Sequence, residues 1–316
     1  MTMAGGGARL VAAMISTSEA DRHIDLFRDV LGMEVVSEQA LTGREAGSLW
    51  GVDARSARVT MLTTPPSYAG VALVEFDPVS EVVIRDGMQG IDTDALKVID
   101  VVTSDAEAGF ARFEEAGFMV SDVRSSYEIE DGAVTETHAY GPEEVVIGIL
   151  DFHTIEASRF VELTDRLFSE AMSISVPVDD LDPVVEWYDR VLGLEVVHRY
   201  GFDAESFKDL VGTDSSAWNV RGTNIGRTTQ EFYFGVIDYG TGDTTRRSLR
   251  ESARPPNRGI AGAVCTVADL GRVVSAAKPD EMIAEPVELA VGPWGRTRAM
   301  TLVAPHGIVH TVVEVL

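Results

Sequence analysis

Two stretches of the chain repeat the same order of apolar and polar positions. His23–Val36 (HIDLFRDVLGMEVV) and Val184–Val197 (VVEWYDRVLGLEVV) both place apolar or aromatic residues at helical spacing. Each then breaks at a glycine, Gly32 or Gly193, and continues as an apolar, β-branched stretch. The pattern predicts a helix that leads directly into a strand, once in each half of the chain.

Strand candidates flank both helices in the same order. Ala8–Ile15 and Ser173–Val178 precede the helices, and two strand-like runs follow each of them, 57–63 with 70–76 and 217–221 with 230–239. The order recurs with weaker similarity over 97–152 and 260–315. All four copies end on an acid between apolar residues, at Glu75, Asp151, Asp238 and Glu314. The sequence therefore predicts four βαβββ modules.

A single module leaves one apolar sheet face uncovered, so modules must pair to enclose a core. We expect an α+β fold in which neighbouring modules pair into two incomplete β-barrels. The N-terminal domain would span residues 1–154 and the C-terminal domain 173–316. Residues 155–172 have the apolar spacing of a linker helix between them.

Two motifs connect this pattern with a known family. The VLGxEVV segment after an aromatic helix, and the run Gly292–Gly307 (GPWGRTRAMTLVAPHG), resemble the vicinal-oxygen-chelate superfamily of glyoxalases, bleomycin-resistance proteins and extradiol dioxygenases. Four modules in one chain are similar to the extradiol dioxygenases, in which one pair of modules houses iron. The resemblance implies barrel pockets for small molecules, and in the metalloenzymes a divalent ion that chelates two substrate oxygens.

The resemblance also implies where metal ligands should be. Metalloenzymes of the family take ligands from the first strands of two modules. The matching positions here hold Ala12, Val98, Ser173 and Gly262. A shift of the alignment recovers only Asp100, which has no counterpart in another module. We therefore expect no metal cofactor; the alternative is Fe²⁺ or another divalent cation held by displaced ligands.

His310 and Glu314 are the predicted catalytic pair. They share one face of the last strand, and a histidine beside a carboxylate is the most economical acid–base pair in the sequence. His306 is expected only to fill the turn before Gly307. The predicted substrate-binding residues in the C-terminal barrel are Tyr233, Glu231, Trp218, His198 and Arg296.

Two further groups are assigned to the surface. Glu136, His138 and Tyr140 form a polar stripe on one strand face, which is expected to face water rather than a pocket. Five arginines in a long connection are expected to pair with the protein's own acids or with a second subunit; the alternative is a gate that grips a carboxylate or phosphate. They are Arg246, Arg247, Arg250, Arg254 and Arg258.

Composition narrows the partners. A formal net charge of −25 repels nucleic acids and anionic membrane surfaces, so neither is an expected partner. A membrane helix needs about 20 consecutive apolar residues, and no stretch of the sequence approaches that length. The N-terminus also lacks a signal-peptide pattern, so we expect a cytoplasmic protein. Cys265 is the only cysteine, which excludes an intrachain disulfide. A small molecule is the expected partner, and a homo-oligomer is possible.

Three functions are compatible with these residues. The first is a metal-independent protein that binds a small aromatic or conjugated carbonyl compound in the C-terminal barrel and acts as an isomerase or lyase by acid–base chemistry. The second is a metal-dependent ring-cleaving dioxygenase or glyoxalase-type lyase. The third is a non-catalytic protein that sequesters an antibiotic. The first two make the chain an enzyme, and the third does not.

Overall fold

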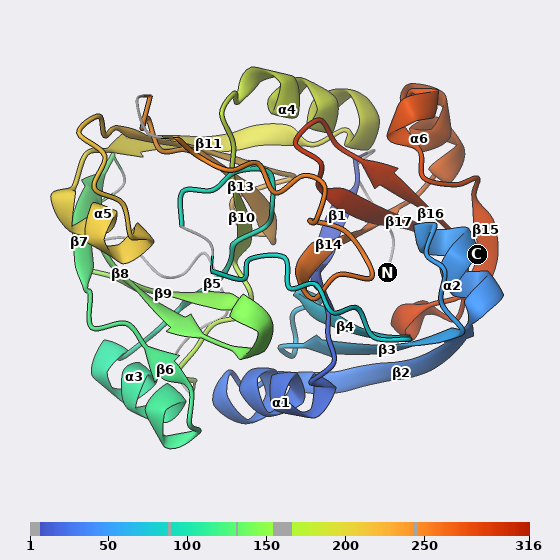
Figure 1. Cartoon of the computed structure of the whole chain (residues 1–316), viewed down its shortest axis with the longest axis horizontal. Coiled ribbons are helices and arrows are strands. Elements are labelled where there is room, and N and C mark those ends of the chain that lie inside the picture. The colour runs from blue at the N-terminus through green and yellow to red at the C-terminus, as the bar shows by residue number, and fades with distance from the viewer. Residues whose placement is uncertain (1–6, 88–89, 131, 154–165, 243–244) are drawn as a thin grey trace.

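The computed structural model describes residues 7–87, 90–130, 132–153, 166–242 and 245–316 (Figure 1). Within them the predicted βαβββ order occurs four times. Module 1 comprises β1 (Arg9–Ser16), α1 (Ala20–Ile24), the π-helical turn η1 (Asp25–Val30), β2 (Glu34–Thr42), α2 (Gly43–Trp50), β3 (Ser56–Thr63) and β4 (Gly70–Asp77). Module 2 comprises β5 (Val98–Val102), α3 (Ala106–Glu115), β6 (Met119–Val120), β7 (Ser125–Ile129), β8 (Gly132–Tyr140), η2 (Pro142–Glu144) and β9 (Val146–Phe152).

The second half repeats the order. Module 3 comprises β10 (Ser173–Pro177), α4 (Asp182–Trp187), η4 (Tyr188–Leu192), β11 (Glu195–Phe202), α5 (Glu205–Val211), β12 (Val220–Gly226) and β13 (Tyr233–Asp238). Module 4 comprises β14 (Gly259–Val267), α6 (Leu270–Ala276), η5 (Pro279–Glu281), β15 (Val287–Ala290), η6 (Gly292–Trp294), β16 (Arg296–Val303) and β17 (Val309–Val315). No helix among these is long and apolar enough to cross a membrane.

The sequence predicted that module 1 pairs with module 2 and module 3 with module 4, and the structure contradicts this. One sheet has the strand order β15-β16-β17-β14-β1-β4-β3-β2 and joins module 1 with module 4. The other has the order β11-β12-β13-β10-β5-β9-β8-β6, with β7 on β8, and joins module 2 with module 3. In both, the two first strands run antiparallel at the centre, β1 with β14 and β5 with β10. All four first strands are mainly apolar, and this apolar pattern does not by itself select the partner of each strand.

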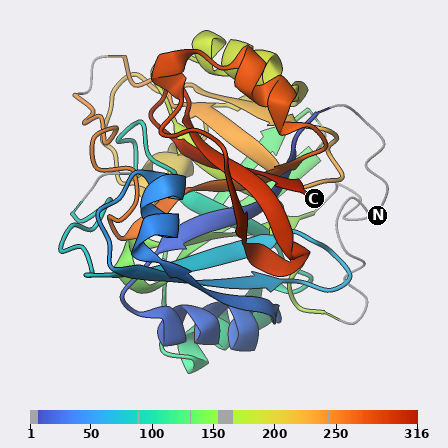
Figure 2. The same cartoon turned by 90° about the vertical axis from the view of Figure 1, so that its right-hand side faces the viewer.

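We call the two curved sheets half-barrel 1/4 and half-barrel 2/3. Strand alternation gives each sheet one face toward its own hollow and one face toward the helices. The helix-facing sides share one apolar core, which includes Phe27 of η1, Phe113 of α3, Trp187 of α4 and Leu270 of α6. Figure 2 shows α4 and α6 on one side of the strands and α1 and α3 on the opposite side.

The structure contradicts the predicted linker helix over the part that it describes. Residues 166–172 are not helical, and residues 155–165 lie outside the described residues. Phe168 forms an isolated bridge with Thr103, and the backbone N–H of Met172 donates to the backbone carbonyl of Asp100. Residues 166–172 therefore follow β5 as extended chain, and Phe168 is buried against Phe113 with ring centroids 5.6 Å apart.

Candidate functional site

Side chains fill the concave side of half-barrel 1/4, whereas that of half-barrel 2/3 contains a cavity. In half-barrel 1/4, α2 places Trp50 inside, where the indole N–H donates to Thr311 Oγ1 at 3.0 Å and the ring meets Phe76 edge-on. A capping box between Thr42 and Glu45 fixes the start of this helix. Methionine and alanine side chains of β1, β3 and β4 occupy the remaining space. This hollow is therefore apolar core.

Half-barrel 2/3 instead encloses a cavity of about 110 Å³. Strand alternation aims every second side chain of β5, β8, β10, β11 and β13 into it. The wall contains aromatic rings together with titratable groups. The titratable groups are Lys97, Asp100, Tyr127, Glu136, His138, His198, Tyr200, Tyr233 and Tyr239.

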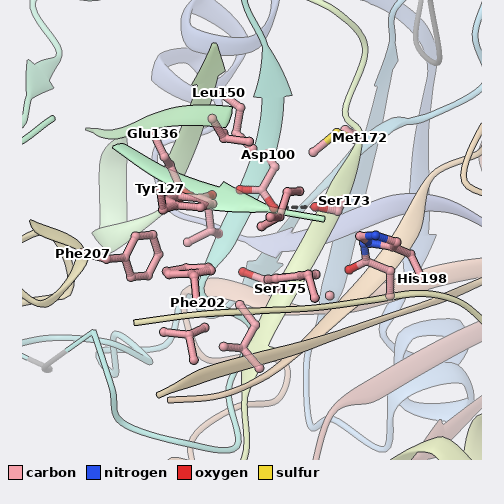
Figure 3. Close-up of a pocket in the computed structure, with 18 of the residues that line it drawn as sticks. Asp100, Tyr127, Glu136, Leu150, Met172, Ser173, Ser175, His198, Phe202 and Phe207 are labelled. Carbon is pink, nitrogen blue, oxygen red and sulfur yellow. Dashed lines mark hydrogen bonds between the residues drawn. The ribbon is translucent and has the colours of Figure 1, made fainter. Parts of the chain in front are cut away.

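Asp100 lies at the centre of the cavity wall (Figure 3). Its carboxyl accepts a hydrogen bond from the Ser173 hydroxyl across the β5–β10 pair. Gly148 is its neighbour on β9, where a Cβ would overlap Asp100 Oδ1. Burial, and then the negative charge of Glu136, raise the pKa of Asp100 to about 8. Asp100 is therefore a protonated carboxylic acid at neutral pH, and it can donate.

Glu136 is the second carboxyl of the cavity. It accepts a hydrogen bond from the Tyr127 hydroxyl at 2.7 Å, and His138 Nε2 lies 3.2 Å from its other oxygen. Burial lowers the pKa of His138, so the imidazole is neutral. Burial and the charge of Glu136 raise the pKa of Tyr127, which keeps the phenol protonated as a donor. The sequence stripe of Glu136 and His138 thus faces the cavity, and the expectation that it faces water is wrong for these two residues.

Lys97 adds a basic group to the same wall. Its Nζ donates to the Tyr239 hydroxyl at 3.2 Å. Burial, and then the positive charge of Arg85, lower the pKa of Lys97 to about 7. Arg85 is itself buried and donates to the backbone carbonyls of 92, 95 and 96. A large fraction of Lys97 is therefore a neutral amine near pH 7.

The opposite wall is aromatic. His198, Tyr200 and Phe202 follow one another on one face of β11, with successive rings nearly parallel and centroids 5.9 and 6.3 Å apart. Phe202 also stacks on Tyr127 at 4.0 Å. Gly222 on β12 lies under the Tyr200 ring, where a Cβ would overlap it. This stack offers a flat apolar surface to a planar ligand.

Two of the predicted substrate-binding residues line the cavity, His198 and Tyr233. Trp218 lies behind the wall, where its ring stacks on Tyr239 with centroids 5.7 Å apart. The residues that line the cavity come from modules 2 and 3 and the segments beside them. The cavity is therefore not in a barrel of modules 3 and 4, as the sequence suggested.

The other two predicted binding residues lie elsewhere. Glu231 forms an ion pair with Arg9 at 3.0 Å. Arg296 is exposed and pairs with Glu288 at 3.2 Å. Neither is among the described residues around the cavity.

The predicted catalytic pair lies outside the cavity as well. His310 is fully buried in the helix-facing core, stacked on Trp187, with its Nε2 3.2 Å from the Tyr188 hydroxyl. Burial lowers the pKa of His310 to about 3, so its imidazole is neutral near pH 7. Glu314 is half-buried near the end of β17, opposite Arg298. His306, expected in a turn, is also buried, and its Nδ1 accepts from the Ile308 N–H.

Four of the five loop arginines pair with acids of the chain, as expected. Arg246 pairs with Asp179, Arg247 with Asp92, Arg250 with Asp94, and Arg258 with Glu143. Arg254 donates to the backbone carbonyl of 251. These contacts tie the long connection to the neighbouring segments.

The residues at the family's ligand positions do not fit a divalent metal. The four ligand positions named from the sequence are Val98 and Ser173 on the first strands of half-barrel 2/3 and Ala12 and Gly262 on those of half-barrel 1/4, and Asp100 faces Gly148 on β9. A single carboxyl and a single hydroxyl provide too few imidazole or carboxylate donors for such an ion. Among the described residues, no three His, Cys, Asp or Glu side chains are grouped to hold an ion.

Comparison with known proteins gives fold neighbours only. No protein-family model and no curated protein matches the sequence. Glyoxalase I from Zea mays superposes with a TM-score of 0.61 at 13% identity, over 97% of this chain and 92% of that one, and a mutant of the same enzyme reaches 0.63. A putative dioxygenase from Bacillus subtilis superposes with a TM-score of 0.52 at 12% identity, over 99% of this chain and 86% of that one.

Proposed function

Since the chain has the four-module fold of the vicinal-oxygen-chelate superfamily, we propose that its 2/3 cavity binds a small aromatic or conjugated carbonyl compound and moves a proton on it. The observation that carries the proposal is the pair of carboxyls, Asp100 and Glu136, on one wall of the cavity. Their environments differ, and such a pair divides into an acid and a base.

The roles follow from the contacts. Asp100, held by Ser173 and kept protonated by burial, donates to the carbonyl oxygen of the ligand. Glu136 takes a proton from the carbon next to that carbonyl, and Tyr127 holds the carboxylate in place. The product is an enol, which returns its proton at the same carbon or at a conjugated one. The aromatic stack of β11 holds the ring of the ligand.

No step of this mechanism needs a metal, in keeping with the donor set at the ligand positions. The proposal therefore favours an isomerase or lyase that works by acid–base chemistry over a ring-cleaving dioxygenase. Sequestration of an antibiotic would use the same aromatic wall without proton transfer, so the test must detect turnover as well as binding.

Phenylacetaldehyde is a suitable probe because it joins a phenyl ring to a carbonyl with acidic α-protons. Proton NMR in D₂O with EDTA present measures how fast the protein exchanges these protons for deuterium. We expect exchange by the wild-type protein and a loss of about 100-fold or more in Glu136→Gln, a typical effect of removing a general base. Asp100→Asn should also be impaired, whereas Glu288→Gln, on the exposed surface, is the matched control.

Four results would overturn the proposal. Exchange unchanged in both cavity variants would place the chemistry elsewhere, and loss in Glu314→Gln alone would favour the C-terminal strand. Exchange only after addition of Fe²⁺ or Mn²⁺ would restore the metalloenzyme alternative. Binding of the probe without exchange, seen as a thermal shift, would favour sequestration.

A further inference from the structure

We propose that the ε-amine of Lys97 forms an imine with the carbonyl carbon of the compound in the cavity, an inference that rests on the function proposed above. A covalent imine is a stronger electron sink than a carbonyl, so it makes the neighbouring C–H bond more acidic. The position of Lys97 carries this inference.

Lys97 is placed as a nucleophile rather than as a structural cation. It is 4% exposed, and its side chain borders the cavity that contains Asp100 and Glu136. Within the described part of the chain it forms no ion pair, and its Nζ makes a single hydrogen bond, to the Tyr239 hydroxyl. A buried ammonium would normally be paired or hydrogen-bonded at all three donors. The contacts therefore suit a neutral amine with a free electron pair.

The charged groups around the amine have opposing effects. Arg85 precedes β5 and disfavours the ammonium form, whereas Glu136 on β8 favours it, as does Asp100 on β5 once its carboxyl ionises. His138 on β8 and Tyr239 after β13 also border the amine. Burial is the largest effect, and it leaves Lys97 with a pKa of about 7. Nucleophilic lysines in other proteins are activated by the same kind of desolvation.

The atoms needed for the reaction are present. The Nζ electron pair attacks the carbonyl carbon, the C–N bond forms, and an N–H proton moves to the oxygen to give a carbinolamine. Asp100 then donates its proton to the hydroxyl, the C–O bond breaks, and water leaves. A protonated imine on Lys97 and a carboxylate on Asp100 result, and these two opposite charges stabilise each other.

A second cavity gives the released water a place to go. It has a volume of about 320 Å³ and is lined by Arg85, Ser121 and Tyr140, among others. Lys97 and His138 border both cavities. Lys97 therefore lies between the ligand cavity and the second cavity.

Reductive trapping tests the imine on the intact protein. Phenylacetaldehyde with sodium cyanoborohydride converts an imine to a stable secondary amine, which adds the mass of the aldehyde less one oxygen. The chain has three lysines, Lys97, Lys208 and Lys278, so peptide mapping assigns the label without ambiguity. Lys208 pairs with Glu205 at 3.0 Å and Lys278 is exposed, and these two serve as internal references.

We expect Lys97 to be labelled at least 10-fold faster than either reference lysine near pH 7. 2-Phenylethanol, which has the ring and the oxygen but no carbonyl, should protect Lys97 and leave Lys278 unaffected. Lys97→Arg should lose the cavity label, and Lys208→Arg should keep it. Because the wild-type peptide map is decisive by itself, the test does not depend on whether the buried variant folds.

The outcomes separate this inference from the proposed function. Exchange of α-protons with no label on Lys97 would overturn the imine and leave the acid–base proposal standing. Labelling of Lys97 no faster than of Lys278, or without protection, would also overturn it. If the probe neither binds, exchanges nor labels, both proposals fail.

Discussion

Replacing Asp100 by asparagine should change how stability depends on pH. The pKa of Asp100 is about 8 in the folded protein and close to 3.8 when the chain is unfolded. Between these values the folded state binds one proton more than the unfolded state, so the free energy of unfolding falls as pH rises. Each pH unit lowers the free energy of unfolding by about 1.4 kcal/mol, so stability falls by about 3 kcal/mol between pH 5 and pH 7.5.

Asparagine keeps the shape of the side chain, and its carbonyl oxygen can still accept from Ser173. The variant cannot ionise, so it should lack the decline of wild-type stability from pH 5 to 7.5. Titratable groups remote from Asp100 contribute equally to both proteins, so their effect cancels in the difference. Glu136 and Lys97 interact with Asp100, so the difference reports this group of three together. Urea unfolding followed by tryptophan fluorescence at several pH values measures it. Asp53→Asn, at an exposed loop position, is the control. Parallel pH profiles for the wild type and Asp100→Asn would refute the assigned pKa and the acid role that depends on it.

Three further predictions follow from the cavity and its surroundings. Gly148→Ala places a Cβ into the space of the Asp100 carboxyl, so the rate of α-proton exchange measured by NMR should fall at least 10-fold. In Gly235→Ala the new Cβ would lie 3.4 Å from Ser175 Cβ, so the rate should fall much less. Trp50→Phe removes a buried hydrogen bond in half-barrel 1/4, so urea unfolding should show a loss of about 1 to 3 kcal/mol with exchange unchanged; loss of exchange would place a function there. Reductive labelling of Lys97 should increase as pH rises through about 7, because only the neutral amine attacks, and a rate that does not change between pH 6 and 8 would contradict this.

The sequence predicts the modules well because their signal is local. The break at Gly32 and Gly193, each with positive φ, ends a helical turn and starts a strand within a few residues. The choice of partner module is different, because it depends on contacts between first strands far apart in the chain. Ala263 pairs with Ala13, and Ile174 pairs with Ile99, so all four residues are apolar. Nothing in that composition selects one partner over another.

The candidate site illustrates the same limit. The alternation of Val134, Glu136 and His138 correctly places them on one strand face, but only the pairing of modules 2 and 3 turns that face into a cavity. Asp100 stands out in the sequence as a lone acid in an apolar strand, and it is the residue that the structure places at the centre. The family motif in module 4 instead directed attention to His310, whose surroundings are core.

The way the modules are joined also orders events during synthesis. Half-barrel 2/3 is made from one continuous stretch, so its strands are all available before module 4 has left the ribosome. In contrast, β1 is translated first and its partner β14 about 250 residues later. The apolar edge of module 1 therefore lacks its partner strand through most of translation, and a chain truncated before module 4 would leave that edge open to misassociation.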